Sequence, residues 1–377
     1  MDLTAPDLPD ATLPDVDHRA RRDRLRARLA ADDVDALYVT HLPNVRWLTG
    51  FTGSSAAVLV AVDPALDLLV TDGRYVTQAA VEVPELERAV VRAGGHQRAV
   101  QRLAEAGAAN VAFEASRLAW DRGERVRQEA AMHHLEPLPR RENVERLRAV
   151  KDPAELRALR AACAITDAAF VAILDTLRPG TAERQVATVL ERTMVDLGAH
   201  RPSFDSIVAS GPNAAVPHHR PTDRRLEPGD LVKIDFGAAY AGYHADMTRT
   251  IALGDPHPRL RDLHERVREA QAAGVAAATA QAEVGAVDRA CRDPITAAGY
   301  GEQFVHPSGH GVGLEIHEWP TLVADGRALL QAGMTVTVEP GVYLAGIGGV
   351  RIEDTVAISA EGPPEVLTRS PRELLVL

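Results

Sequence analysis

The chain has little cysteine, few aromatic residues and no long apolar run. Its 377 residues include two cysteines, Cys163 and Cys291, which lie far apart in alanine-rich segments. This argues against a disulfide framework and favours a reducing compartment. No apolar run reaches the length of a membrane span. Aromatic residues make up 4% of the chain, and together with abundant alanine this is typical of helix-rich packing by small side chains.

An excess of positive charge is also missing. The chain has 42 Lys and Arg residues against 53 Asp and Glu residues, a formal net charge of −11. Binding to a phosphate backbone requires clustered positive charge, so a nucleic-acid partner is not expected. Residues 1–17 contain acids and prolines where a secretory signal needs a basic start and an apolar core. We therefore expect a cytoplasmic protein that binds neither nucleic acid nor membrane.

Length and pattern divide the chain into three parts. A chain of 377 residues exceeds the usual size of a single core, so two domains are expected. Residues 1–16, with three prolines among scattered aspartates, are predicted to form a flexible tail. Residues 17–145 alternate strands with helices, which predicts an α/β domain. Residues 146–377 carry helix pairs followed by antiparallel strands, which predicts an α+β domain.

Two segments allow local predictions. Residues 42–54 (LPNVRWLTGFTGS) are dense in turn formers and predict a loop that exposes Arg46 and Trp47. A helix is predicted to begin at Pro153, because Asp152 can cap it, Pro153 suits the first helical position, and Glu155 can reach back in a capping box. This helix opens the α+β domain.

The segment VKIDFGAAYAGYHADMTRT, residues 232–250, predicts a hairpin that carries two acids. Asp235 lies near the end of its first apolar run and Asp246 at the start of its second strand. Burying a carboxylate costs several kcal/mol unless a cation or a hydrogen-bond network replaces its hydration. A single such Asp is most often a hydrogen-bonded structural residue, so this hairpin alone does not identify a site.

The same pattern recurs 104 positions later. Leu226, Gly229, Val232, Asp235 and Gly237 correspond to Leu330, Gly333, Val336, Glu339 and Gly341. Glu353 then follows Glu339 much as Asp246 follows Asp235. Such a duplication predicts two halves that face each other around a pseudo-twofold axis, where four carboxylates converge. Their mutual repulsion requires multivalent cations among them.

Histidines supply the remaining ligand. Nine of the fourteen histidines lie between His200 and His317. Glycines flank His310 and leave its imidazole unobstructed. Imidazole together with carboxylates suits Mn, Co, Zn or Fe rather than Ca. Two Asp, two Glu and one His balance two divalent cations, and such a pair, about 3.5–4 Å apart, can hold a bridging hydroxide. The expected reaction is hydrolysis of an amide or ester.

Several strings together resemble the pita-bread metallopeptidases, in particular the Xaa-Pro peptidases aminopeptidase P and prolidase. The strings are LPNVRWLTGF, TDGRY, SGPNAAVPHHRP, KIDFGAAYAGYHADMTRT, HPSGHGVGLEIHE, TVEPGVY and GGVRIEDT. The resemblance implies a creatinase-like N-terminal α/β domain and a pita-bread α+β C-terminal domain with internal pseudo-twofold duplication. It also implies a homodimer or homotetramer that hydrolyses the bond between an N-terminal residue and a following proline.

The resemblance assigns roles to nine residues. Asp235 would bind one metal ion, His310 and Glu339 the other, and Asp246 and Glu353 both. His218 and His317 would contact the scissile peptide, His306 would line the pocket for proline, and Arg351 would position Glu353 or the substrate. This chain departs from the family after His306, where Pro307 stands in place of a common glycine. His219 is an alternative to His218. The implied cofactors are two divalent ions, with Mn first and Co, Zn or Fe also compatible.

Three alternatives stay open at this point. The sequence does not decide between an Xaa-Pro aminopeptidase and an Xaa-Pro dipeptidase, although Arg220 and Arg351 could hold a free proline carboxylate. A creatinase-type hydrolase has the same two domains but needs no metal. A pita-bread domain can also act as a non-catalytic peptide-binding module. Both of the latter kinds typically lose metal ligands, whereas all five are present here.

Overall fold

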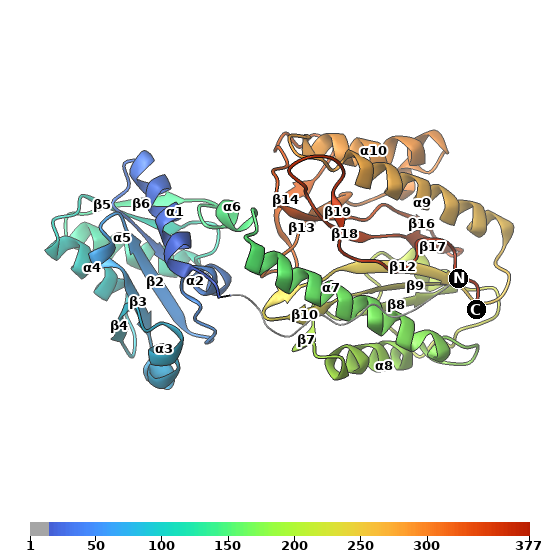
Figure 1. The fold of residues 1–377 in the computed structure, drawn as a ribbon, viewed down its shortest axis with the longest axis horizontal. Coiled ribbons are helices and arrows are strands. Elements are labelled where there is room, and N and C mark those ends of the chain that lie inside the picture. Colours follow the sequence, from blue (N-terminus) through green and yellow to red (C-terminus); the bar gives the residue numbers. More distant parts are fainter. Residues whose placement is uncertain (1–14) are drawn as a thin grey trace. The chain divides into compact units, whose positions relative to one another are not determined.

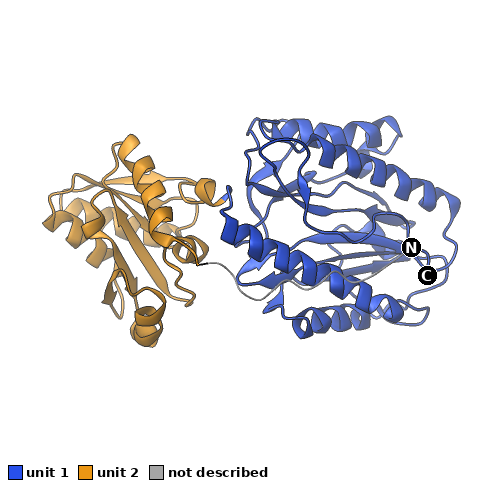
Figure 2. Cartoon of the chain, viewed as in Figure 1, with its two compact units in different colours: residues 1–14, 149–377 blue, residues 15–148 orange. Residues whose placement is uncertain are grey.

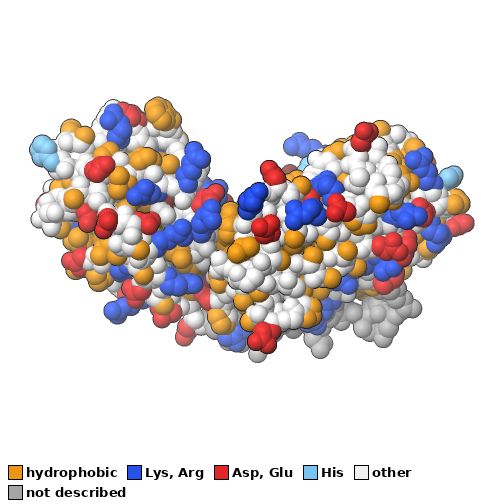
Figure 3. Space-filling model, turned by 90° about the horizontal axis from the view of Figure 1, so that it is seen from above, with side chains coloured by type: hydrophobic (Ala, Val, Ile, Leu, Met, Phe, Trp, Pro, Cys, Tyr) orange, Lys and Arg blue, Asp and Glu red, His pale blue; other side chains and the backbone are white. Residues whose placement is uncertain are grey.

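The computed structural model describes residues 15–377, and they form two compact units, residues 15–148 and residues 149–377 (Figure 2). The predicted tail, residues 1–16, lies outside the described residues except for Asp15 and Val16. Among the described residues, no helix is long and apolar enough to cross a membrane. On the face drawn in Figure 3, acidic and basic side chains are interspersed on both units.

The unit of residues 15–148 is built on a six-stranded mixed sheet with the order β4-β3-β2-β1-β5-β6. The strands are β1 (Ala36–Val39), β2 (Ala56–Ala61), β3 (Leu68–Thr71), β4 (Glu87–Val90), β5 (Asn110–Glu114) and β6 (Glu136–Arg140). The helices are α1 (His18–Ala31), α2 (Leu42–Thr49), α3 (Val76–Glu82), α4 (Gly95–Glu105), α5 (Trp120–Met132) and α6 (Glu145–Arg148). Strands β1, β5 and β6 are parallel, as are β3 and β4, whereas β2 runs antiparallel to both of its neighbours. The α/β prediction is confirmed.

The prediction of a loop at residues 42–54, after β1, is wrong over most of that segment. Residues Leu42–Thr49 form helix α2, which has Pro43 in its first turn and ends at Gly50 with φ of 82°. The turn formers therefore flank a helix rather than interrupt it. Trp47 is fully buried rather than exposed, and the guanidinium of Arg21 lies 5.0 Å from the centre of its ring.

The unit of residues 149–377 contains four long helices. They are α7 (Pro153–Ile173), α8 (Glu183–Asp196), α9 (Pro258–Ala277) and α10 (Val284–Ala297). Helix α7 begins as predicted: Asp152 Oδ1 accepts from the backbone N–H groups of Ala154 and Glu155, and Glu155 Oε2 accepts from the N–H of Asp152. Figure 1 shows α9 and α10 on one side of the strands and α8 on the other.

The strands of this unit form two main sheets and two small ones. The first main sheet has the order β12-β9-β8 and the second β14-β13-β15-β18-β19. Their strands are β8 (Ile207–Ser210), β9 (Leu231–Phe236), β12 (Met247–Ala252), β13 (Gly309–Gly311), β14 (Glu318–Leu322), β15 (Thr335–Val338), β18 (Asp354–Ala357) and β19 (Glu365–Val366). The small sheets contain β7 (Arg201–Pro202), β10 (Ala238–Tyr240) and β11 (Tyr243–His244), and β16 (Gly341–Leu344) and β17 (Gly348–Arg351).

The two halves repeat the same arrangement. The antiparallel trio β8-β9-β12 is matched by β13-β15-β18. The bond from Gly180 N to Leu226 O, 2.8 Å long, recurs from Gln281 N to Leu330 O at 2.8 Å. Residues of α7 and α8 pack with β9 and β12 in one core, and residues of α9 and α10 pack with β15 and β18 in another. The internal duplication predicted from the sequence is therefore confirmed.

Candidate metal centre

The duplication places its four acids at equivalent ends of strands. Asp235 is the penultimate residue of β9, and Asp246 immediately precedes β12. Glu339 immediately follows β15, and Glu353 immediately precedes β18. Because β9 pairs with β12 and β15 with β18, each hairpin brings its two acids to the same end of its strand pair. Asp235, Asp246 and Glu353 are buried, and Glu339 is partly buried.

His310 lies in the middle of β13 and faces these acids. Its Nε2 is 3.5 Å from Asp246 Oδ2 and 3.4 Å from Glu339 Oε1. Single ligand atoms of Asp246, His310 and Glu353 all lie within 4.8 Å of one another. His310 Nδ1 donates to the carbonyl oxygen of Gly311 at 3.0 Å, which leaves Nε2 with its lone pair toward the acids. A Cβ at Gly309 would clash with the carbonyl of Thr337, so glycine allows this strand to approach β15.

Only one of the two carboxylate oxygens of Asp235 has a hydrogen-bond partner among the described residues. Its Oδ2 accepts from Arg351 Nη2, whereas its Oδ1 is buried without a hydrogen-bond partner among the described residues. Arg351 Nε also donates to Thr248 Oγ1 at 3.0 Å, and that hydroxyl donates to Glu353 Oε2 at 2.6 Å. Arg351 therefore contacts Asp235 directly and reaches Glu353 through Thr248. The unpartnered Oδ1 of Asp235 is suited to bind a cation.

The electrostatics of the cluster also fit divalent cations. Burial, followed by repulsion from Glu353, raises the pKa of Asp246 well above its usual range. Burial and repulsion from Glu339 do the same to the pKa of Glu353, and burial raises the pKa of Glu339 to about 7. The single guanidinium of Arg351 offsets one of four negative charges. Carboxylate and imidazole donors at this density suit divalent transition ions.

Three further imidazoles lie beside His310 or beside the residues around it. His317 is exposed, and its ring centre is 4.3 Å from that of His310. His306 Nε2 is 2.8 Å from the hydroxyl of Tyr343, and its Nδ1 is 2.8 Å from the carbonyl oxygen of Pro307. His218 is exposed and interacts electrostatically with both His306 and His317. The unusual Pro307 thus supplies the carbonyl that orients His306.

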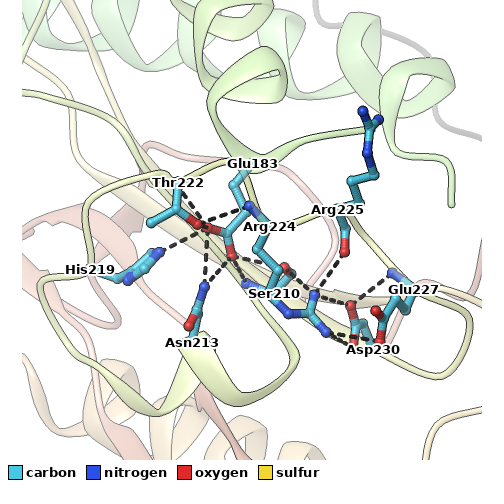
Figure 4. A network of polar contacts seen from close by, with 9 residues as sticks. All are labelled: Glu183, Ser210, Asn213, His219, Thr222, Arg224, Arg225, Glu227 and Asp230. Carbon is cyan, nitrogen blue, oxygen red and sulfur yellow. Dashed lines mark hydrogen bonds and ion pairs between the residues drawn. The ribbon is translucent and has the colours of Figure 1, made fainter. Parts of the chain in front are cut away.

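His219 lies in a different environment from His218. Its Nε2 is 2.9 Å from Glu183 Oε2, at the start of α8, in a network that ties down the segment after β8 (Figure 4). The structure therefore separates the two adjacent histidines, with His219 anchored and His218 exposed. Sequence reasoning missed Glu183, Tyr343 and Thr248. Tyr343 and Thr248 lie within the sequence strings on which the family resemblance is based, whereas no sequence pattern indicated a role for Glu183.

Comparison with known proteins agrees with this geometry. Residues 157–360 match the family described as Metallopeptidase family M24, and residues 21–150 match the Creatinase/Prolidase N-terminal domain. The uncharacterized peptidase YqhT of Bacillus subtilis (strain 168) is 40% identical over 357 residues, which cover 94% of this chain and 99% of YqhT.

Two solved structures show the same fold over more than nine tenths of the chain. The Xaa-Pro dipeptidase from Bacillus anthracis has a TM-score of 0.90 at 39% identity, covering 96% of this chain and 100% of that one. The X-Pro aminopeptidase from Thermotoga maritima MSB8 has a TM-score of 0.86 at 33% identity, covering 94% of this chain and 99% of that one. A pita-bread unit with a buried cluster of acids and imidazole, in one chain with a creatinase-type domain, defines a metal-dependent hydrolase. The chain belongs to metallopeptidase family M24.

Proposed function

We propose that the protein hydrolyses the peptide bond between an N-terminal residue and a following proline and that it does so with two divalent metal ions. The observation that carries this proposal is the convergence of one imidazole and four carboxylates, three buried and one partly buried, from the two repeated halves. The names of the relatives from Bacillus anthracis and Thermotoga maritima support proline peptides as the substrate class. Mn is the first candidate for the ion, and Co, Zn and Fe suit the same donors.

The five ligands would divide between two ions. Asp235, through its unpartnered Oδ1, would hold one ion, and His310 and Glu339 would hold the other. Asp246 and Glu353 would be shared by both. When bound, two such ions supply an activated water nucleophile and polarise the carbonyl of the scissile bond. Tyr343, Thr248 and Arg351 hold the carboxylates and His306 in place through the hydrogen bonds described above.

His317 and His218 would act on the peptide itself. His317 is exposed toward one side, and its partial enclosure, followed by the neighbouring His310, lowers its pKa below the usual 6.5. This direction favours the neutral imidazole at pH 7. A neutral imidazole can donate an N–H to the oxyanion that develops on the scissile carbonyl. Its other ring nitrogen can accept the proton that the attacking water loses, and the imidazolium so formed can pass a proton to the leaving amine. His218 lies on an exposed segment near the same imidazoles and would bind the peptide backbone.

Three aromatic rings would form the pocket for proline. The ring centre of His306 is 5.2 Å from that of Phe304 and 5.6 Å from that of Tyr343. Burial and the charge of Arg351 lower the pKa of His306 to about 3, so this wall stays uncharged and suits an apolar pyrrolidine ring.

The preference for dipeptides or longer peptides depends on which protein groups lie next to the carbonyl end of the substrate proline. Arg351 is 3% exposed and engaged with Asp235 and Tyr343, whereas Arg220 is exposed. Arg220 is therefore the arginine available to a free proline carboxylate. We also propose that the protein forms a homodimer or homotetramer.

The test is hydrolysis of Xaa-Pro and Xaa-Pro-Xaa peptides by the full chain supplied with Mn²⁺. We expect cleavage of at least one peptide class and none of a matched peptide with alanine in place of proline. Preference for Xaa-Pro, reduced in Arg220→Gln through a higher KM, identifies a dipeptidase. Preference for the longer peptide identifies an aminopeptidase. Cleavage of neither peptide contradicts the proposal.

A further inference from the structure

A cavity of about 320 Å³ lies within the unit of residues 15–148, and the proposed peptidase activity does not use it. It lies at the carboxyl ends of the parallel strands. Its lining includes Thr40 after β1, Thr71 at the end of β3 and Arg92 after β4. In open α/β sheets this edge is where small ligands bind, because loops leave the strands there and helices begin there. The cavity is therefore in the place where this architecture accommodates a ligand.

The charged side chains in the lining of the cavity are mainly basic. Arg92, Arg122 and Arg125 contribute guanidinium groups, and Asp72 contributes the acid. That acid is already paired, because Arg74 Nη2 donates to Asp72 Oδ2 at 2.8 Å. Within residues 15–377, no carboxylate lies within ion-pair distance of Arg92 or Arg122. An anion in the cavity would meet uncompensated positive charge.

Helix α4 begins at the cavity with its N–H groups unprotected. The helix starts at Gly95, Gly94 precedes it with φ of 74°, and no side chain caps it. The N–H groups of a first helical turn have no acceptor within the helix and attract oxyanions. A Cβ at Gly95 would lie 3.0 Å from Val70 Cγ1 and 3.3 Å from the Tyr38 hydroxyl, so this position has little room for any other residue.

A second observation, independent of the helix, points to a ligand. Tyr38 is 6% exposed and lines the cavity, and its hydroxyl has no hydrogen-bond partner among the described residues. The contact with Gly95 places this hydroxyl at the start of α4. Burial raises the pKa of Tyr38, with the charge of Arg122 opposing the shift, so the hydroxyl remains a donor at neutral pH. The side chain is buried and its hydroxyl faces the cavity, so an oxyanion there would supply the acceptor that the chain does not.

We propose that this cavity binds a tetrahedral oxyanion, a phosphate group either free or on a small organic molecule. The Tyr38 hydroxyl, the first-turn N–H groups of α4 and the guanidinium of Arg122 would donate to its oxygens. All of these are donors, and together they match an acceptor-only dianion better than a neutral ligand. This site lies entirely within residues 38–126 and adds a second ligand to the protein beside its peptide substrate.

The experiment is a calorimetric titration of the full chain with inorganic phosphate at constant ionic strength, with chloride as the balancing salt. We expect saturable binding, weakened about tenfold by Tyr38→Phe and at least as much by Arg122→Gln. Arg98→Gln is the matched control, because Arg98 is an exposed residue of helix α4 that does not line the cavity. This variant should bind phosphate as the wild type does. Far-UV circular dichroism and the thermal midpoint without phosphate confirm that each variant is folded.

Two further titrations define the ligand. Glycerol phosphate that binds more tightly than inorganic phosphate, with the same loss in Arg122→Gln, identifies an organic phosphate, and weaker or equal binding identifies the free ion. Acetate that binds as tightly as phosphate overturns the phosphate assignment. Absence of phosphate binding overturns the proposal, as does binding that Tyr38→Phe and Arg122→Gln leave unchanged.

Discussion

Glu353 is 1% exposed, and its surroundings make its charge unfavourable in the absence of cations. Three other carboxylates share its site, and one guanidinium offsets only part of their charge. Thr248 donates a hydrogen bond to Glu353, but a single neutral donor cannot balance the repulsion. Bound metal should therefore stabilise the ionised form of Glu353 more than any hydrogen bond within the chain does.

Replacing Glu353 with Gln removes that charge and a shared metal ligand. We expect bound metal to fall and peptide hydrolysis to drop more than about 100-fold. In excess chelator the same variant should be more stable than the wild type by about 1–2 kcal/mol, because repulsion is relieved. Metal analysis, an activity assay and urea unfolding measure these effects. The exposed Glu361→Gln is the control, and unchanged metal content and activity in Glu353→Gln would be inconsistent with the proposed ligand set.

His264 predicts the pH dependence of stability away from the metal centre. It is 2% exposed in α9, and burial lowers its pKa from 6.5 to about 4. The unfolded chain binds a proton at higher pH than the folded chain does. Its contribution is thus fully present above pH 6.5 and is lost as pH falls from 6.5 toward 4, by up to about 3 kcal/mol.

Urea unfolding of the wild type and His264→Gln between pH 7 and pH 4 measures this contribution. The variant should lose less stability over this range than the wild type, whereas the exposed His200→Gln should follow the wild type. Parallel pH profiles for all three proteins would show that His264 titrates alike in the folded and unfolded states.

Sequence reasoning identified the five proposed ligands, but it assigned Arg351 to Glu353 or the substrate rather than to Asp235, and it missed Glu183. Asp235 and Glu339 were marked because they recur at a fixed offset. Arg351 contacts Asp235 across 116 positions of sequence, and Glu183 contacts Ser210 and residues beyond it. Such long-range hydrogen bonds leave no periodic trace in a single sequence, so only the folded chain reveals them.

At the scale of helices and strands, the sequence pattern predicted those features that depend on residues close to one another in the chain. The capping box at Asp152 placed the start of α7 correctly because its hydrogen bonds join residues three apart. Helix α2 was missed because Pro43 and Gly50 were interpreted as interrupting the segment that they in fact bound. The hairpins β9-β12 and β15-β18 were predicted because their acids and glycines repeat together.

The segment from Ser210 to Thr222 depends on one buried carboxylate. Glu183 is fully buried and accepts from the backbone N–H and hydroxyl of both Ser210 and Thr222, from Asn213 Nδ2 at 3.0 Å, and from His219 (Figure 4). Although burial opposes ionisation, these bonds lower the pKa of Glu183 to about 2. The carboxylate thus fixes the segment that carries His218.

Glu183→Gln should loosen this segment while the metal ligands stay intact. An amide turns one acceptor oxygen into a donor that faces other donors, so we expect a loss of about 2–4 kcal/mol in unfolding free energy. Metal content should be unchanged, while kcat/KM falls because His218 is misplaced. Glu227→Gln, an exposed change on the same network, is the control. A fall in metal content together with activity would instead mean that Glu183 supports the metal centre.

At the scale of the whole molecule, the two units have separate hydrophobic cores. Residues of β1, β2, β3, α4 and α5 form a cluster within residues 15–148, and two other clusters lie within residues 149–377. All five proposed metal ligands belong to the second unit. Metal should therefore stabilise one unit and leave the other unaffected.

Differential scanning calorimetry of the full chain tests this separation. We expect two transitions, of which chelator lowers only one, by several degrees, because ions that bind the folded state alone stabilise that unit. A fragment of residues 15–148 should reproduce the transition that chelator leaves unchanged. A single transition would show that the two units unfold as one, and equal shifts of two transitions would show that metal stabilises both units.

The central claim is that two repeated halves bring four acids and an imidazole together to hold two divalent ions. Its most direct test is to strip the full chain of metal and titrate it with Mn²⁺, counting bound ions by electron paramagnetic resonance while hydrolysis of a proline peptide is followed. The account predicts two ions per chain and activity that returns as they bind. Binding of no ion, saturation at one ion per chain, or full activity of the metal-free protein would each contradict it.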